Sequence, residues 1–359
     1  MTSATKVIDS PARPRADRGR SLRASSRFEW AAVGLAAAIA VGAHVDAWAH
    51  GHVASTLETF FTPWHALLYA SFAATTAFLV LCAAWTGARP WEWVRVLPDG
   101  YGLSLVGCVL FGIGGVLDLG WHLTFGIERN FQALVSPTHL ILIGSAGLIG
   151  SGALRAAWRR PGRAIGWPAI ASATLTLTML TFFGQFDHPF TSQWAALGAT
   201  LVPAQPAEEL GILGVIFQSA LLMGVVLLLV RRFDLPLGSL TFLMGVNAVF
   251  VTMIHGLDLV ILVGVLGGVA ADVAYRALRP SAARLPQLRV FAFVVPAVLY
   301  ALYFRGLIVA DGVWWPVHLW AGAPVVAGLT GLLVSYCVVP PPAPAAAAAE
   351  PVAAATLRA

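Results

Sequence analysis

Two segments of the chain carry the same ordered set of side chains that can bind a metal. Residues 46–65 read DAWAHGHVASTLETFFTPWH, and residues 118–139 read DLGWHLTFGIERNFQALVSPTH. Each begins with Asp, has His four residues later, and ends with Thr or Ser followed by Pro-X-His. A carboxylate with two imidazoles is a common ligand set for transition metals. The repeat therefore predicts metal binding by two sets of residues: Asp46, His50 and His65, and Asp118, His122 and His139.

The spacing within each segment predicts a helical hairpin that gathers its three ligands. Residues four apart on a helix lie on one face, so each Asp is next to the first His of its segment. Thr62-Pro63 and Ser136-Pro137 are typical of helix starts, with Thr or Ser as the N-cap and Pro at the first helical position. We therefore expect the second His of each segment on the first turn of the returning helix.

Other histidines and aspartates repeat this pattern only in part. DGVWWPVH ends in another Pro-X-His, and FDHPF and HGLD each place His close to Asp. Ionisable residues are costly in a membrane and are therefore candidates for function, although a lone His near the interface is more often structural. The additional candidate polar or metal-binding residues are His44, His52, Asp187, His188, His255, Asp258, Asp311 and His318.

The composition places these residues in a membrane protein. The 359 residues are 58% hydrophobic and 11% charged, whereas soluble domains carry about 25% charged residues. A membrane-crossing helix needs about 20 apolar residues. We predict an all-α, polytopic transmembrane bundle (residues 28–339) between a disordered basic tail (1–27) and a disordered Pro/Ala tail (340–359). The expected spans are roughly 29–49, 64–86, 101–122, 137–158, 165–186, 207–230, 236–256, 257–278, 288–307 and 313–338.

The positive charges predict the orientation of these ten spans. Lys and Arg of short loops are retained in the cytoplasm. If both termini are cytoplasmic, only Arg129 and Arg305 among the 22 basic residues lie on the other face, whereas all nine histidines map to that outer face. We therefore expect a multi-pass protein of the cell membrane with a polar site near its outer face. The net charge of +5 does not indicate nucleic-acid binding, because the charges lie in loops between apolar segments.

The second segment resembles a hairpin of a known copper-protein family. DLGWHLTFGIERNFQALVSPTHLILI is similar to the copper-binding hairpin of the C subunit of particulate methane and ammonia monooxygenases. The matching residues are Asp118, Trp121, His122, Thr124, Arg129, Ser136, Pro137 and His139. The first segment resembles a second hairpin of that family, in which Asn stands in place of Asp46. The resemblance implies copper at Asp118, His122 and His139, with Asp46, His50 and His65 as a second candidate set.

The resemblance is limited to these two short segments. The gap between the two histidines of the second segment is longer than in the family, and ten spans exceed the number in that subunit. Methane or ammonia oxidation is therefore not carried over. The resemblance implies partner membrane subunits and a small apolar substrate that reaches the site through the lipid bilayer.

Three functions fit these residues. The first is a copper-dependent, monooxygenase-like oxidoreductase or a subunit of one, with no catalytic residue assigned beyond the metal ligands. The second is an intramembrane zinc hydrolase resembling the ceramidase and adiponectin-receptor group, in which the metal would activate a water molecule. The third is a metal-handling permease or assembly protein. The inner halves of the spans argue against the third, because Asp272 is the only charge expected to be buried there. Haem bound by two histidines is a weaker option.

Overall fold

The computed structural model describes residues 24–53, 62–126, 131–196, 204–255, 258–310 and 312–341. Throughout these ranges the regular structure is helical, and backbone pairing between extended residues is limited to isolated bridges such as that of Ala164 with Asp234. The predicted all-α fold is confirmed. The ends of the chain predicted to be disordered lie mostly outside the described residues.

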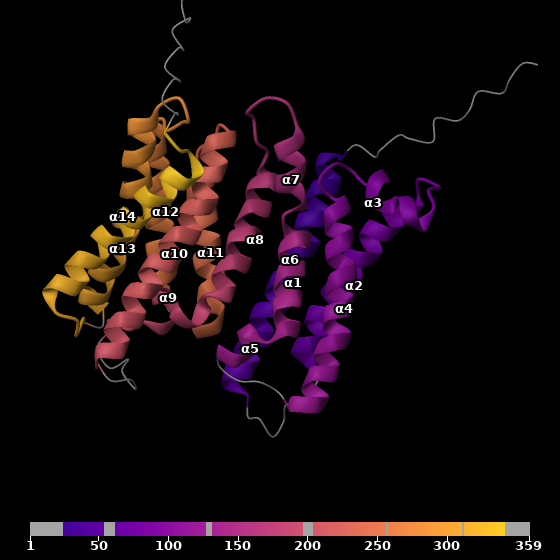
Figure 1. Cartoon of the computed structure of the whole chain (residues 1–359), viewed down its shortest axis with the longest axis horizontal. Helices are drawn as coiled ribbons and strands as arrows, with labels where there is room; N and C mark the ends of the chain where they lie inside the picture. Colours follow the sequence, from indigo (N-terminus) through magenta and orange to yellow (C-terminus); the bar gives the residue numbers. More distant parts are fainter. Residues whose placement is uncertain are drawn as a thin grey trace, which may run out of the picture.

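The helices form two groups that lie side by side (Figure 1). The N-terminal group consists of α1 (Ser26–His52), α2 (Pro63–Ala84), α4 (Gly102–Phe125), α6 (Pro137–Gly150) and α7 (Gly152–Arg159). The C-terminal group consists of α10 (Ala204–Arg232), α11 (Ser239–His255), α12 (Asp258–Leu278), α13 (Leu285–Ala310) and α14 (Val317–Val338). Short helices lie in the connections: η2 (Pro90–Glu92), α3 (Trp93–Val96), α5 (Phe131–Val135), η3 (Gln185–Asp187) and α9 (Pro189–Ser192).

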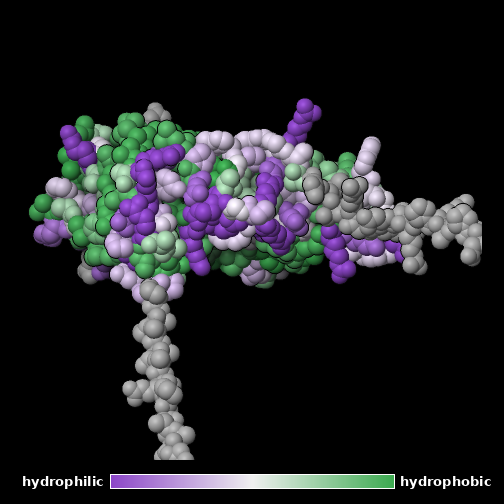
Figure 2. Space-filling view, turned by 90° about the horizontal axis from the view of Figure 1, so that it is seen from above, coloured by the Kyte–Doolittle hydropathy of each residue, from purple (hydrophilic) through white to green (hydrophobic). Residues whose placement is uncertain are grey.

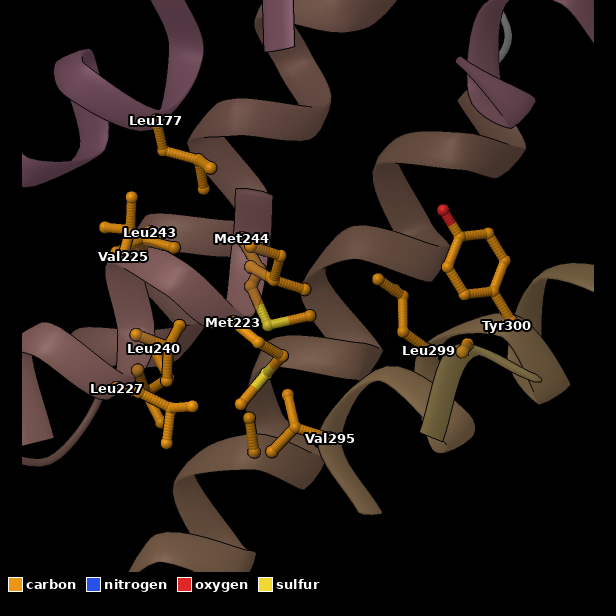
Figure 3. Close-up of a cluster of buried hydrophobic side chains, with 14 of the residues drawn as sticks. Leu177, Met223, Val225, Leu227, Leu240, Leu243, Met244, Val295, Leu299 and Tyr300 are labelled. Carbon is orange, nitrogen blue, oxygen red and sulfur yellow. The ribbon is translucent and has the colours of Figure 1, made fainter. Parts of the chain in front are cut away.

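Helix α8 (Trp167–Phe183) joins the two groups. It contacts α1, α6 and α7 of the N-terminal group and α10 and α11 of the C-terminal group. Its buried residues contribute to both hydrophobic cores, Leu175 to the N-terminal one and Leu177 to the C-terminal one. Figure 3 shows the C-terminal core, where Met223, Met244 and Val295 meet. The segment that follows α8 is thereby held between the two groups.

Seven of the described helices are long and apolar enough to cross a membrane, which indicates a multi-pass membrane protein. They are α1, α2, α4, α10, α12, α13 and α14. Helices α6 and α7 pass the same test as a pair bent by 46°, and α8 and α11 are shorter apolar helices. Each of the ten predicted spans thus coincides with a helix or with this bent pair. That all ten cross the membrane stays a prediction.

The two ends of the bundle differ in their chemistry. Helix α1 begins and α14 ends at the same end, and Figure 2, which looks onto that end, shows hydrophilic residues gathered on it with hydrophobic ones around them. Ion pairs of arginines connect the segments at this end. Arg163 Nε lies 2.8 Å from Asp234 Oδ1, and Arg160 pairs with the buried Glu29. The histidines of the repeated segments lie at the opposite end, where α1 and α4 finish.

Asp272, the charge expected to be buried among the inner halves of the spans, has a structural role. It is 4% exposed and accepts hydrogen bonds from the backbone N–H of Leu240 and of Thr241, the latter at 2.9 Å, and from the Thr241 hydroxyl at 2.6 Å. These are free donors of the first turn of α11, which need an acceptor. Asp272 of α12 therefore caps the start of α11.

Candidate metal centres

The first predicted set of ligands meets at the junction of α1 and α2. Asp46 and His50 lie one turn apart near the end of α1, and His65 lies on the first turn of α2. His65 Nε2 is 3.3 Å from Asp46 Oδ1, and His50 Nε2 is 3.6 Å from Asp46 Oδ2. His65 is 5% exposed and the other two are partly buried. The predicted hairpin thus brings the three side chains together, and we call them the first triad.

The second set repeats this arrangement at the junction of α4 and α6. His122 Nε2 is 3.3 Å from Asp118 Oδ2, and His139 Nε2 is 3.6 Å from Asp118 Oδ1. Asp118 is 1% exposed and His122 is 8% exposed, so this second triad is the more deeply buried of the two. The ring centroids of its histidines are 5.6 Å apart, against 5.8 Å for His50 and His65.

Helix caps orient the second histidine of each triad. Thr62 and Ser136 are N-caps whose side-chain oxygens accept the backbone N–H of His65 and His139, as predicted from the sequence. The same hydroxyls lie 3.1 Å from His65 Nδ1 and 2.6 Å from His139 Nδ1. One cap therefore starts the helix and also fixes the ring, so that Nε2 faces the carboxylate.

The tautomer of His122 suits a cation between its ring and Asp118. His122 Nδ1 lies 3.3 Å from the carbonyl oxygen of Gly126, which can only accept, so Nδ1 carries the hydrogen. A neutral His122 then presents the lone pair of Nε2 to the carboxylate oxygen 3.3 Å away. Two such electron pairs repel each other unless a proton or a metal ion lies between them. The tautomer is the one that metal-binding histidines adopt when Nδ1–H is held by a carbonyl.

The distances within both triads fit a single metal ion in each. With metal–ligand bonds of about 2.1 Å, neighbouring donors of a tetrahedral site lie about 3.4 Å apart. The four measured contacts between Asp oxygens and His Nε2 atoms span 3.3 to 3.6 Å, and all three donors of each triad lie within 4.8 Å of one another. Among the described residues, His, Asp, Glu and Cys side chains form two such groups of three, not one group of six. Each triad can hold one ion and leaves coordination positions for a further ligand.

Both triads face one cavity of about 260 Å³. Asp46 and His50 of the first triad and His139 of the second line it. Most of the remaining lining is apolar: Ile39, Ala43, Ala47, Leu68, Phe111, Leu134, Leu142, Ile143, Ala146, Met179, Phe182 and Phe186. The polar remainder comes from the segment after α8 and consists of Gln185, Thr191 and Ser192. This cavity was not predictable from the sequence, because its walls come from helices that are distant along the chain.

Two of the additional histidines on α1 have local partners. His44 is 1% exposed, lies between the rings of Phe182 and Phe250, and donates from Nδ1 to the carbonyl of Ala40 at 2.8 Å. His52 is exposed and stacks on Trp48. Its Nδ1 donates to the carbonyl of Trp48 at 2.8 Å. Neither belongs to a triad.

The pair Asp187 and His188 lies in the segment between α8 and α10. His188 Nδ1 accepts the backbone N–H of Phe190 at 3.1 Å, and burial lowers the pKa of this histidine to about 3. Burial raises the pKa of Asp187 to about 6. His188 lines a second, smaller cavity of about 30 Å³ among the helices of the C-terminal group, away from the triads' cavity.

The remaining candidates are not brought to the triads by any described contact. His318 is exposed on the first turn of α14. His255 ends α11 and Asp258 begins α12, and the positions of their side chains lie outside the described part of the structure, as does the whole of Asp311.

Two residues that sequence reasoning missed belong to the site. Thr138 donates its hydroxyl hydrogen to Asp118 Oδ1 at 2.7 Å and so supports the carboxylate of the second triad. The role of Thr138 was predictable from its position directly before His139, because a hydroxyl on the first turn of the helix can reach the metal ligands. Gln185 lines the cavity from η3, and an isolated glutamine after a helix carries no such signal.

Comparison of the chain with protein-family models, curated proteins and solved structures gives no match.

Proposed function

We propose that this chain is a metalloprotein of the cell membrane that binds one copper ion in each triad and acts as a monooxygenase-like oxidoreductase, alone or with partner membrane subunits. Its substrate is a small apolar molecule that enters from the lipid bilayer. The observation that supports this best is the pair of Asp/His/His triads at one apolar cavity. Copper is the preferred metal because imidazole-rich sets bind it strongly and because the two hairpins resemble those of a copper family.

The donor set suits a reaction in which the metal must bind one more ligand. The two imidazoles and the carboxylate of a triad would hold the copper, which would supply the activation of dioxygen. The overall reaction inserts one oxygen atom into a C–H bond and releases the other as water. It consumes two electrons and two protons, which a hydroquinone of the membrane can supply.

The protein's own residues hold the ligands and keep water away. Ser136 and Thr62 fix the imidazoles of the returning helices, and Thr138 holds the carboxylate of Asp118. The apolar walls of the cavity favour a hydrocarbon over water beside the triads. This arrangement concentrates an apolar substrate next to the triads.

A zinc hydrolase is the second candidate, since two histidines, a carboxylate and an open position also describe catalytic zinc sites. The buried carboxylate of Asp118, which lies near both imidazoles, fits either metal. A metal-handling permease has less support, because Asp272 is engaged as a helix cap and does not continue a path of ligands inward.

The test is metal content followed by activity. The protein is purified in mild detergent, reconstituted separately with copper and with zinc, and the metal per chain is measured by mass spectrometry. We expect about two copper ions per chain in the wild type and about one in Asp46→Asn or Asp118→Asn, since one ion binds per triad. His52→Gln is the control, because this histidine lies on α1 outside the triads.

The outcomes separate the candidates. Copper at two per chain, with uptake of dioxygen that depends on an apolar substrate and a hydroquinone, supports the oxidoreductase. Exclusive zinc binding, with hydrolysis of a lipid amide or ester, supports the hydrolase. Failure of the wild type to hold either metal above trace amounts after reconstitution rejects both.

A further inference from the structure

We infer that the cavity shared by the triads binds an apolar molecule that carries one hydroxyl group, and that Gln185 anchors this hydroxyl. The inference deepens the proposed function by naming a ligand class for the same cavity, and its link to oxidation rests on that function. The binding itself depends on the cavity and on η3 and α9, not on a metal.

The first observation is a pair of polar atoms that have no protein partner. Gln185 is 7% exposed, and its Oε1 atom has no hydrogen-bond partner among the described residues; the same is true of the buried Thr191 Oγ1. Both residues line the cavity. A buried polar group without a partner is costly, and the large majority of such groups in proteins are satisfied. A ligand that supplies the missing hydrogen bonds would remove this cost.

The chemistry of the two atoms favours a hydroxyl. An alcohol has both a donor for the amide oxygen of Gln185 and an acceptor for the hydroxyl of Thr191. A ketone or an ether cannot donate. An ammonium group or an ionised carboxylic acid would have to leave water for a mostly apolar cavity, which is unfavourable.

The size of the cavity sets the length of the apolar part. An apolar cavity of about 150 Å³ accommodates benzene, and this one measures about 260 Å³. A body of about six to ten carbon atoms therefore fills it, whereas a one-carbon molecule leaves most of it empty.

The positions of the polar residues give the ligand a direction. Gln185 lies on η3 and Thr191 on α9, whereas the metal-binding residues of the lining lie on α1 and α6. A hydroxyl held by η3 and α9 leaves the hydrocarbon part of the molecule for the rest of the lining, which includes Asp46, His50 and His139. The site therefore recognises one end of the ligand and presents the other part to the triads.

The experiment measures binding to the metal-free protein in lipid nanodiscs. Fluorine-labelled 1-heptanol and fluorine-labelled heptane are titrated separately, and the bound fraction is followed by fluorine NMR, with empty nanodiscs as the blank for partition into lipid. We expect tighter binding of heptanol than of heptane. Gln185→Leu should weaken heptanol binding by about threefold to tenfold, which corresponds to one net hydrogen bond, and leave heptane binding unchanged.

Thr178→Val is the control for the loss of a buried polar atom. Thr178 is 0% exposed and its Oγ1 atom also has no partner among the described residues, but it lines neither cavity. We expect this variant to bind both probes as the wild type does. Thr191→Val, which keeps the shape of the side chain, provides a second test if Gln185→Leu does not fold.

Equal binding of heptanol and heptane by the wild type overturns the inference. A preference for heptanol that survives in both Gln185→Leu and Thr191→Val overturns it as well. Copper content is measured on the same preparations after reconstitution. A wild type that prefers heptanol but binds no metal refutes the proposed function and leaves the inference standing, whereas two copper ions without this preference refute the inference alone.

Discussion

Hydroxyl groups next to Nδ1 decide which ring nitrogen of His65 and His139 faces the carboxylate. Ser136 accepts the backbone N–H of His139 at 3.4 Å, and its Oγ lies 2.6 Å from the ring. This single side chain therefore has two effects, on the start of α6 and on the direction of Nε2. Removing it should affect metal affinity beyond its effect on the helix.

We predict that Ser136→Ala weakens copper binding at the second triad by about tenfold to a hundredfold, the usual effect of losing a group that orients a metal ligand. Loss of the cap should also lower stability by about 1 kcal/mol. Competition with a chelator of known affinity measures the copper dissociation constant, and Ser136→Thr should restore it.

The control for this prediction is Ser145→Ala. Ser145 is a buried serine of the same helix whose hydroxyl donates to the carbonyl of Ile141. Equal copper affinities for Ser136→Ala and Ser145→Ala would show that the cap does not orient the ligand.

Asp187 gives a prediction for pH. Its pKa rises from an ordinary value of 3.8 to about 6 because burial disfavours the charged form. Between these values the folded protein keeps a proton that the unfolded chain has released, so stability falls as the pH rises from about 4 to about 6 and then stays level. Asp187→Asn should match the wild type at pH 4 and be more stable at pH 8, by about 1 kcal/mol after allowance for partial exposure.

Unfolding midpoints at pH 4 and pH 8 check this difference. Asp99→Asn, which replaces an exposed carboxylate, is the control. An Asp187→Asn variant that is less stable than the wild type at pH 8 would mean that the charged carboxylate has a stabilising partner.

At the scale of the elements, the two hairpins were largely predictable from local signals. The Asp-x-x-x-His spacing and the Thr/Ser-Pro-x-His starts depend on residues close together in the chain, and the structure confirms the caps at Thr62 and Ser136. The bend between α6 and α7 was not predicted, because residues 137–158 appear as one apolar run. Pairing of helices from different hairpins depends on side-chain fit, which a single sequence does not display.

Helices α13 and α14 give a prediction about such fit. A Cβ atom on Gly331 would lie 2.1 Å from the carbonyl oxygen of Ala292, whereas one on Gly322 of the same helix would have no neighbour within 4 Å. Gly331→Ala should therefore force the helices apart and cost about 1–3 kcal/mol. Gly322→Ala should be neutral or slightly stabilising, since Ala favours a helix more than Gly does.

Thermal unfolding midpoints of Gly331→Ala and Gly322→Ala in the same detergent check these two expectations. A midpoint for Gly331→Ala equal to that of Gly322→Ala would show that the contact between α13 and α14 is looser than described.

At the scale of the whole molecule, contacts between distant loops bear on the number of spans. Arg163, before α8, pairs with Asp234, after α10, and Arg232 donates to the carbonyl of Trp158 at 3.2 Å. The chain therefore leaves this end through α8 and returns to it through α10. Two membrane crossings, one by α8 and one by α10, agree with the ten predicted spans. They require that the short helix α8 crosses the membrane. Hydropathy alone predicted that α8 crosses the membrane. It did not predict the contacts between the loop before α8 and the loop after α10.

We predict that reporters fused after Arg163 and after Arg232 lie on the cytoplasmic side, and that one fused after Gly312 lies outside. Alkaline phosphatase is active only outside the cytoplasm. Green fluorescent protein is fluorescent only inside, and not after export through the general secretory pathway, so the two reporters check each other. Phosphatase activity after Arg232, with none after Arg163, would mean that α8 does not cross the membrane.

Each triad is complete within one helical hairpin, α1 with α2 or α4 with α6, so its ligands are synthesised early. The ribosome finishes α2 before most of the chain exists, so under the proposed function the first ion would be captured while later helices are still being inserted. The second ion can follow once α6 has emerged. We therefore predict that metal supply acts on the nascent chain and that a truncated product that ends after Arg163 already carries both ions.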